Sequence, residues 1–307
     1  MTTPSSSAVP PLSPERTRVG FVGIGNMGAP MAGHLVKAGW RVSAYDIDPA
    51  KVRAFVQGHG GTAAESLAEL GRNADVVITM LPDGRVVRAV TLGDGQSDCL
   101  ASGLARGAVV IDMSSSSPVG TRALGAELEK RGISLLDAPV SGGVRGAEAA
   151  TLAIMVGGDP ALAERCAPLL VPMGRRFYAG RLGSGHAVKV LNNYVSAAGL
   201  AAAGEALIIG ARFGVDPKVM LDIVNASSGR NNSTENKFVQ FILNRKFNSG
   251  FALGLMAKDL ALAMEVAKAV DVPAELGRAC LDLWQEAERS LGGGADHTEI
   301  VRHLGEL

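Results

Sequence analysis

The sequence Arg18-Val-Gly-Phe-Val-Gly-Ile-Gly-Asn-Met-Gly28 joins a short apolar run to three glycines spaced as GxGxxG. The apolar run predicts a buried β-strand, and the residues after the glycines have helical composition. In such a turn Gly23 permits a tight bend, Gly25 lets the backbone approach a pyrophosphate, and Gly28 lets the helix pack closely on the strand. The helix N-terminus then faces the phosphates. The residues expected to contact a dinucleotide are Gly23, Ile24, Gly25, Asn26, Met27 and Gly28.

An acidic residue follows the second expected strand, which spans residues 41–45. Asp46 stands where a carboxylate accepts hydrogen bonds from the ribose hydroxyls of NAD and repels the 2′-phosphate of NADP. The next residues, Ile47-Asp48-Pro49, contain no Arg that would bind such a phosphate. A purely structural role, capping the helix that begins near Pro49, fits Asp48 better than Asp46. The sequence therefore favours NAD over NADP as the cofactor.

Two further buried strands end in loops that are expected to meet the same cofactor. Apolar runs at 74–81 and 107–111 predict these strands. Ligands of a doubly wound sheet bind beyond the carboxyl ends of its strands. Leu81 and Pro82 at the end of one strand, and Ser115 after the other, are therefore expected to contact the cofactor.

A second glycine-rich stretch, Asp137-Ala-Pro-Val-Ser-Gly-Gly143, follows another expected strand at 133–136. The hydroxyl of Ser141 and the backbone N–H groups of Gly142 and Gly143 form a group that can bind a carboxylate. The same residues also fit an ordinary turn. Taken alone, they do not decide between the two roles.

Beyond Gly183 the strand pattern disappears and helical periodicity replaces it. Lys189 and Asn193 are i and i+4 on the first of these helices, so their side chains lie on one face, one turn apart. An ammonium and an amide placed together can hold a small oxygen-bearing substrate and pass it a proton. Such a pair alone usually marks a solvated face. The glycine-rich stretches and the Lys258-Asp259 pair later in the chain favour a catalytic role.

The expected fold is an α/β Rossmann-type doubly wound sheet followed by an all-α C-terminal domain, joined by a long helix. The switch from βα alternation to helices predicts a nucleotide-binding domain over 18–182 and a helical substrate and oligomerisation domain over 183–307. The Ser- and Pro-rich segment 1–17 is expected to be a disordered leader. Helices of the second domain are expected at 183–212, 217–226, 234–244, 253–270, 273–290 and 297–304.

Composition excludes several classes of partner. The 307-residue chain has 30 Lys and Arg and 30 Asp and Glu, and a formal charge of zero argues against nucleic acid or an anionic membrane. Its three cysteines lack CxxC spacing, which suits a reducing, cytoplasmic compartment. Its five histidines lack metal-ligand spacing, so no metal is expected. No apolar run approaches the ~20 residues that span a bilayer. Apolar faces in the helical half predict a homodimer or homotetramer.

Several motifs occur together in a specific order: Gly20-Phe-Val-Gly-Ile-Gly-Asn-Met-Gly28, Met80-Leu-Pro82, Asp137-Ala-Pro-Val-Ser-Gly-Gly143, Met155-Val-Gly-Gly158, Gly183-Ser-Gly-His-Ala-Val-Lys-Val-Leu-Asn-Asn193 and Met256-Ala-Lys-Asp-Leu260. In this order they resemble the β-hydroxyacid dehydrogenase family, which includes 3-hydroxyisobutyrate dehydrogenase and tartronate semialdehyde reductase and is similar to 6-phosphogluconate dehydrogenase. The resemblance runs from about residue 19 to the C-terminus. Ser227-Ser-Gly-Arg230 also resembles the 3-hydroxyisobutyrate branch.

The resemblance implies roles for individual residues. The Lys matching Lys189 is the catalytic acid/base of the family, and the residues matching Asn193 and Ser141–Gly143 hold the substrate. The Lys matching Lys258 reaches the nicotinamide cofactor, and the hydroxyl residue matching Ser115 contacts the cofactor near the nicotinamide.

Two positions depart from the family pattern, and one stretch matches no named branch. Thr usually stands where this chain has Ser115, a change that keeps the hydroxyl. Gly often stands where Ala150 lies, which puts the loop shape there in question. The stretch 231–237 after Arg230 matches no named branch and is expected to face the substrate, so the resemblance leaves the substrate open.

The function expected from these features is NAD-dependent oxidation of a 3-hydroxy acid, similar to 3-hydroxyisobutyrate, to its semialdehyde. Lys189 is the expected general acid/base, and His186 on the same turn is the next candidate. One alternative is a reductase that acts on a small semialdehyde, such as tartronate or succinic semialdehyde, with NAD(P)H. A non-catalytic dinucleotide-binding module is the other, although it would be expected to lose Lys189 or Asn193.

Overall fold

The chain divides into two units, Met1–Lys189 and Val190–Leu307, at a point inside helix α8 (Ser184–Phe213). The computed structural model describes residues 10–93, 95 and 97–305. The boundary expected from the sequence, at 182/183, marks the start of α8. The first turns of α8 belong to the sheet unit because their backbone bonds to it, with the N–H groups of Gly183 and His186 both donating to Asp137.

A twisted sheet forms the centre of the first unit. Its strands pair in the order β3-β2-β1-β4-β5-β6-β8-β7, with β9 beside β8. Neighbours from β3 to β6 are parallel, whereas β8 runs antiparallel to β6 and β7. The order β3-β2-β1-β4-β5-β6 is that of the doubly wound dinucleotide-binding fold, which confirms the expected fold class. The strands are β1 (Arg18–Val22), β2 (Arg41–Tyr45), β3 (Thr62–Ala63), β4 (Val76–Thr79), β5 (Val109–Asp112), β6 (Ser134–Asp137), β7 (Val140–Ser141), β8 (Leu152–Gly157) and β9 (Gly174–Gly180).

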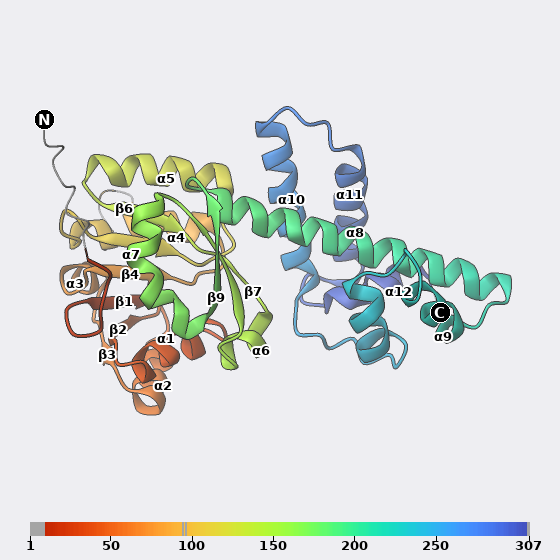
Figure 1. Cartoon of the computed structure of the whole chain (residues 1–307), viewed down its shortest axis with the longest axis horizontal. Helices are drawn as coiled ribbons and strands as arrows, with labels where there is room; N and C mark the ends of the chain where they lie inside the picture. The colour runs from red at the N-terminus through yellow and green to blue at the C-terminus, as the bar shows by residue number, and fades with distance from the viewer. Residues whose placement is uncertain (1–9, 94, 96, 306–307) are drawn as a thin grey trace, which may run out of the picture. The chain divides into compact units, whose positions relative to one another are not determined.

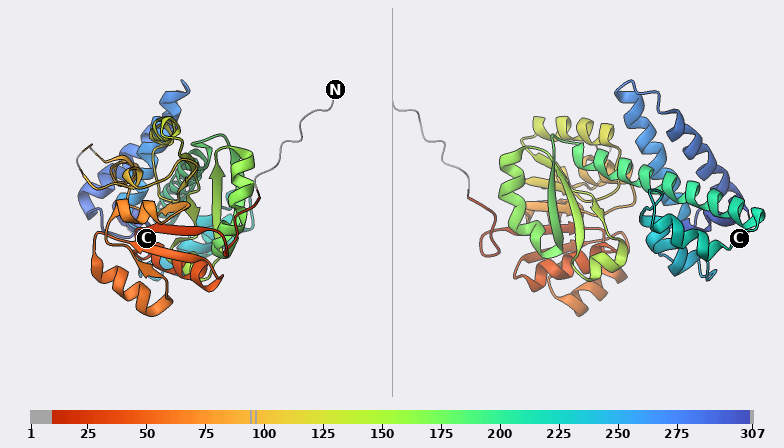
Figure 2. Two further views of the ribbon diagram at one scale, coloured as in Figure 1. Left: turned by 90° about the vertical axis from the view of Figure 1, so that its left-hand side faces the viewer. Right: turned by 45° about the vertical axis from the view of Figure 1, so that its right-hand side comes forward.

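Helices cover both faces of this sheet because successive strand residues point to opposite sides. Val76 and Ile78 pack in the core beneath α1 and α7, whereas Val77 packs with α3 on the other face. Figures 1 and 2 show α5 and α1 on opposite sides of the sheet. The helices are α1 (Gly28–Lys37), α2 (Pro49–His59), α3 (Leu67–Arg72), α4 (Gly84–Leu92), η1 (Leu100–Ser102), α5 (Pro118–Lys130), α6 (Gly143–Glu148), α7 (Pro160–Leu170) and η2 (Val171–Met173).

The predicted disordered leader, 1–17, is corrected over its second half. Residues 1–9 lie outside the described residues. Leu12, however, is buried in the main core of the first unit, and its N–H donates to the carbonyl of Arg165 at 3.0 Å. Thr17 is buried as well. The apolar side chain of Leu12 therefore anchors the segment before β1, which a composition rich in Ser and Pro does not predict.

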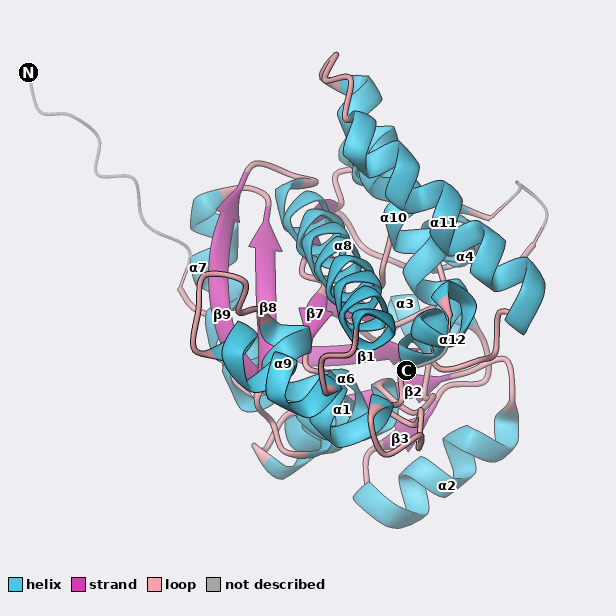
Figure 3. Ribbon diagram, turned by 90° about the vertical axis from the view of Figure 1, so that its right-hand side faces the viewer, coloured by secondary structure: helices cyan, strands magenta, loops and turns pink. Residues whose placement is uncertain are grey.

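The described part of the second unit consists of helices and one isolated bridge, Ala252–Asp296 (Figure 3). Its core includes the fully buried side chains of Phe238, Leu260 and Trp284. The helix expected over 234–244 is a π-helix, η3, a form that is rare and often found at functional sites. After α8 the elements are α9 (Pro217–Asn225), η3 (Ser233–Ile242), α10 (Leu253–Ala269), α11 (Glu275–Leu291), η4 (His297–Glu299) and α12 (Ile300–Leu304).

Helix α8 is long and apolar enough to cross a membrane, by length and composition only. This is weak evidence, because a helix in a protein core meets the same criteria. Ala197, Leu200 and Leu207 of α8 do pack in the helical core. The helix was expected over 183–212, and its apolar run was not expected to span a bilayer because Glu205 interrupts it.

Candidate functional site

The loop between β1 and α1 has the backbone that its glycines predict. Gly23 has φ 97°, and a Cβ there would lie 2.2 Å from the carbonyl oxygen of Met80. A Cβ on Gly28 would lie 1.8 Å from the carbonyl oxygen of Gly23, so loop and helix can approach this closely only with glycine. A Cβ on Gly25 would meet nothing within 4 Å. These residues fit a bound pyrophosphate, since Gly25 leaves its side of the loop open.

Asp46 is tied to that glycine loop. Its carboxylate accepts hydrogen bonds from the N–H of Ile24 at 2.8 Å and from the N–H of Asp48 at 2.9 Å. The cap of α2 is Asp48, which accepts from the N–H of Ala50, as the sequence analysis preferred. Asp46 is thus held beside the glycine loop and does not cap α2. Lys51, which the sequence analysis did not single out, lies 4.0 Å from Asp46.

Buried polar groups hold together the carboxyl ends of β4 and β5. The hydroxyl of Ser114 accepts a hydrogen bond from the N–H of Leu81 at 2.9 Å. The buried carboxylate of Asp112 accepts from the hydroxyl of Thr79 at 3.0 Å and from the hydroxyl of Ser116 at 2.6 Å. These bonds fix two loops at the edge where a doubly wound sheet binds its ligand. The loop after β4 carries Leu81 and Pro82, and the loop after β5 carries Ser115.

His186, the second candidate base, has a structural environment. Its side chain is fully buried, with Nδ1 2.9 Å from the hydroxyl of Thr121 and Nε2 3.0 Å from the carbonyl oxygen of Ser114. The carboxylate of Asp137 accepts from the N–H groups of Gly183 and His186, both at 2.7 Å, and so satisfies the first amides of α8. Both ring nitrogens of His186 are engaged within the protein, which disfavours it as a base.

The second glycine-rich stretch runs from β7 into α6. Ser141 ends β7, where it pairs with Ala153, and it is half-buried. Gly142 has φ 134° and Gly143 has φ 60°, and both are exposed. Only glycine adopts this pair of conformations readily. The turn leaves the backbone of both glycines accessible to a ligand.

Lys189 is buried, with 8% of its surface exposed. Asn193, which follows at i+4 on α8, is also buried, and its Nδ2 donates to Oδ2 of the buried Asp259 at 2.6 Å. Oδ1 of Asn193 accepts from Asn192 at 3.2 Å. The ammonium of Lys258 lies 3.9 Å from Oδ1 of Asp259. Asp259 therefore fixes the orientation of the Asn193 amide and is close to Lys258.

Two family models together match residues 18–304 of the chain. Residues 18–183 match the sequence model of the NAD-binding domain of 6-phosphogluconate dehydrogenase, and residues 183–304 match that of the NAD-binding part of NADP-dependent 3-hydroxyisobutyrate dehydrogenase. The chain belongs to the β-hydroxyacid dehydrogenase family. It is an NAD(P)-dependent oxidoreductase of hydroxy acids.

Relatives of this β-hydroxyacid dehydrogenase act on different compounds. The chain is 38% identical to the 2-(hydroxymethyl)glutarate dehydrogenase of Eubacterium barkeri, over 92% of this chain and 93% of the relative. It is 39% identical to the NAD-dependent L-serine dehydrogenase of Pseudomonas aeruginosa, over 87% of this chain and 91% of the relative. Among solved structures, the 3-hydroxyisobutyrate dehydrogenase of Mycobacterium tuberculosis with L-serine has a TM-score of 0.85 and 35% identity, over 94% of this chain and 99% of that one.

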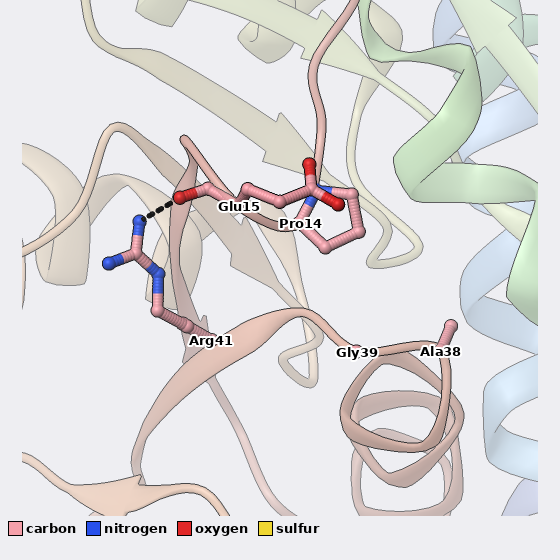
Figure 4. A pocket seen from close by; sticks show the side chains of 5 residues that line it. All are labelled: Pro14, Glu15, Ala38, Gly39 and Arg41. Atoms are coloured by element: carbon pink, nitrogen blue, oxygen red, sulfur yellow. Dashed lines mark hydrogen bonds between the residues drawn. The ribbon is translucent and has the colours of Figure 1, made fainter.

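One hollow of this dehydrogenase lies away from the residues described above. It measures about 410 Å³ and is lined by Pro14, Glu15, Ala38, Gly39 and Arg41 (Figure 4). Arg41 is the first residue of β2, so the hollow is at the amino ends of the strands. Ligands of such sheets bind at the carboxyl ends. The guanidinium of Arg41 donates a hydrogen bond to the carbonyl oxygen of Glu15, and this bond helps to hold the segment before β1.

Sequence reasoning missed Asp112, Asp137 and Asp259, the carboxylates that fix the loops and the amide described above. Each is almost fully buried. A buried charge requires partners, so an Asp at the end of an apolar run was a usable signal for Asp112 and Asp137. Asp259 was noticed only as the neighbour of Lys258, because its partner Asn193 is distant in sequence.

Proposed function

We propose that this dehydrogenase oxidises the primary alcohol of a 3-hydroxy acid to the semialdehyde, with Lys189 as general acid/base. The observation that carries the proposal is the buried Lys189 one turn before Asn193, whose amide Asp259 orients. Lysine can serve as a general acid or base in such a position.

The names of the relatives point to one class of substrate. 3-Hydroxyisobutyrate, L-serine and 2-(hydroxymethyl)glutarate all carry a CH₂OH group on the carbon next to the carboxylate. They differ in the third substituent of that carbon, which is methyl, ammonium or carboxyethyl. The reaction R–CH₂OH + NAD⁺ → R–CHO + NADH + H⁺ is the same for all three. The invariant part of the substrate is thus the hydroxymethyl carboxylate.

Each candidate substrate-site residue has a defined role in this proposal. The backbone N–H groups of Gly142 and Gly143 and the hydroxyl of Ser141 bind the substrate carboxylate, and Asn193 hydrogen-bonds the substrate. The neutral amine of Lys189 accepts the hydroxyl proton as the alcohol is oxidised. The bound nicotinamide supplies the hydride acceptor. In the reverse direction the ammonium of Lys189 donates that proton to the carbonyl oxygen, so the same residues serve reduction of the semialdehyde.

NAD is the proposed cofactor ahead of NADP. Gly23 to Gly28 would bind the pyrophosphate, with Leu81, Pro82, Ser115 and Lys258 as further cofactor contacts. The carboxylate of Asp46, which accepts a hydrogen bond from the N–H of Ile24, would accept hydrogen bonds from the ribose hydroxyls and repel a 2′-phosphate. Lys51 at 4.0 Å weakens that repulsion, so the preference is expected to be moderate.

We further propose a cytoplasmic homodimer or homotetramer. Large apolar side chains of the second unit are exposed, Val195 by 69%, Ile209 by 68% and Phe213 by 88%, and burial between subunits would remove them from water. The thiols Cys166 and Cys280 are buried, and burial raises their pKa values to about 12 and about 11, which keeps them unreactive. Light scattering at micromolar concentration tests the assembly.

The experiment that tests the catalytic proposal is Lys189→Arg, followed by stopped-flow hydride transfer with 3-hydroxyisobutyrate. A guanidinium keeps the charge but does not give up its proton at working pH. The expected loss of hydride-transfer rate is about 10²–10⁴-fold, the usual contribution of a general acid/base group. NAD affinity should change little, because the proposed cofactor contacts are other residues. Lys268→Arg, on the exposed end of α10, is the matched control.

Near-normal hydride transfer by Lys189→Arg from pH 7 to 10 would show that Lys189 is not the base. A panel of hydroxy acids with NAD, and of semialdehydes with NADH and NADPH, tests substrate, direction and cofactor together.

A further inference from the structure

Lys237, a lysine of the helical unit that lies outside the family motifs, is on the π-helix η3. Lys237 is partly buried, and its ammonium donates to the hydroxyl of Ser196 on α8 at 3.2 Å. The start of η3 is held to the same helix by Asn231, whose Nδ2 donates to the carbonyl oxygen of Gly199 at 3.4 Å. The stretch 231–237 therefore runs along α8, with Lys237 pointing at it.

The charge of Lys237 is not neutralised by an ion pair within the described residues. The acid that acts electrostatically on Lys237 is Asp296, whose carboxylate is already bonded to the hydroxyl of Ser249 and to the N–H groups of Gly250 and Thr298. His297 is buried beside Lys237, and burial together with that charge lowers its pKa to about 4, so it is neutral near pH 7. A partly buried ammonium in such surroundings favours an anion.

Ser196 places this ammonium near the residue that is proposed to hold the substrate. Asn193 and Ser196 are i and i+3 on α8, so they lie on one face, separated by about 4.5 Å along the axis. A compound bound to the amide of Asn193 therefore has the ammonium of Lys237 within reach of a short side arm. This side arm is the variable substituent on the carbon next to the substrate carboxylate.

We propose that Lys237 and Ser196 bind a second carboxylate of the substrate, so that the enzyme prefers 3-hydroxy acids with an acidic side arm to those with an apolar or cationic one. The inference rests on the proposed function, and it narrows the substrate class. It predicts the order carboxyethyl, then methyl, then ammonium for the variable substituent. The ammonium of a serine-like substrate would meet the like charge of Lys237.

The ionisation of Lys237 supports this assignment. Burial lowers the pKa of Lys237 to about 8, whereas the charge of Asp296 raises it. A carboxylate in contact would favour the charged ammonium and raise that pKa again. The substrate carboxylate would thus add a counter-charge in direct contact with Lys237, next to the indirect effect of Asp296.

The test compares 2-(hydroxymethyl)glutarate with 3-hydroxyisobutyrate, which share the reacting group and differ in the side arm. The unmodified enzyme should have the higher kcat/KM for the diacid. In Lys237→Met the ratio of kcat/KM for diacid over monoacid should fall about 10- to 100-fold, the loss expected for a hydrogen bond to a charged group. The exposed Lys246→Met is the matched control and should keep the ratio.

Binding of non-reacting acids gives a second, independent measurement. Glutarate should bind the NAD complex of the unmodified enzyme at least 10-fold more tightly than butyrate, and Lys237→Met should remove most of that difference. Equal losses for both hydroxy acids, or equal binding of glutarate and butyrate, would overturn the proposal. If glutarate binds through Lys237 but no hydroxy acid is oxidised, the proposed reaction fails while the anion site stands.

Discussion

The hydrogen bond between Asn193 and Asp259 allows a graded test of how the Asn193 amide is oriented toward the substrate. Nδ2 of Asn193 lies 2.6 Å from Oδ2 of Asp259, and both side chains are buried, with 7% and 1% exposed. Asp259→Ala removes the acceptor, and Asp259→Asn keeps an acceptor oxygen but loses the charge. The two substitutions therefore separate the hydrogen bond from its charge.

The expected magnitudes follow from this geometry. A buried hydrogen bond to a charged group contributes about 1.5–3 kcal/mol, so Asp259→Ala should lower kcat/KM for the hydroxy acid by about 10- to 150-fold. A neutral bond is about half as strong, so Asp259→Asn should lose no more than about 10-fold. Asp222→Asn, on the exposed face of α9, serves as the control.

A double-mutant cycle shows whether Asp259 acts through Asn193. The assay is steady-state oxidation of the hydroxy acid, with NAD affinity titrated separately because Lys258 lies 3.9 Å from Asp259. In an Asn193→Ala background, Asp259→Ala should cause little further loss of kcat/KM. The reasoning is refuted if the two losses add in full, since Asp259 would then act independently of the amide.

Three further outcomes are expected. Asp46→Ala combined with Ile47→Arg should shift the kcat/KM ratio from NAD toward NADP, and an unchanged ratio would remove Asp46 from cofactor selection. Ala150 has φ 55°, so Ala150→Val should destabilise the protein by more than about 1 kcal/mol in urea unfolding, whereas Ala150→Gly should be neutral or stabilising. Burial and the charge of Lys237 lower the pKa of His297 from 6.5 to about 4, so the unfolded chain takes up a proton first as the pH falls between these values. Stability should therefore decline over this window, and less steeply in His297→Asn, as unfolding at pH 4, 5, 6 and 7 would show.

Patterns that are local in the sequence predicted most of the fold. Glycine spacing at Gly23, Gly25 and Gly28 located the βα turn, since each glycine meets a steric demand within a few residues. Apolar periodicity located β1, β2 and the helices from α8 onward, because side-chain direction repeats with the backbone. The short elements β3, β7 and α6 were missed, since a few residues carry too little periodicity to be recognised.

The sequence by itself determined the glycine loop, through the spacing of its glycines. The switch from βα alternation to helices determined the fold class and the position of Lys189 and Asn193 on one helix. Only the tertiary structure decided which polar group each charged side chain contacts. Asp137 joins the first turn of α8, Asp259 joins Asn193, and Lys237 joins Ser196, each across dozens of residues. Such pairs arise because folding must give every buried charge a partner, and no local periodicity encodes which distant residue supplies it.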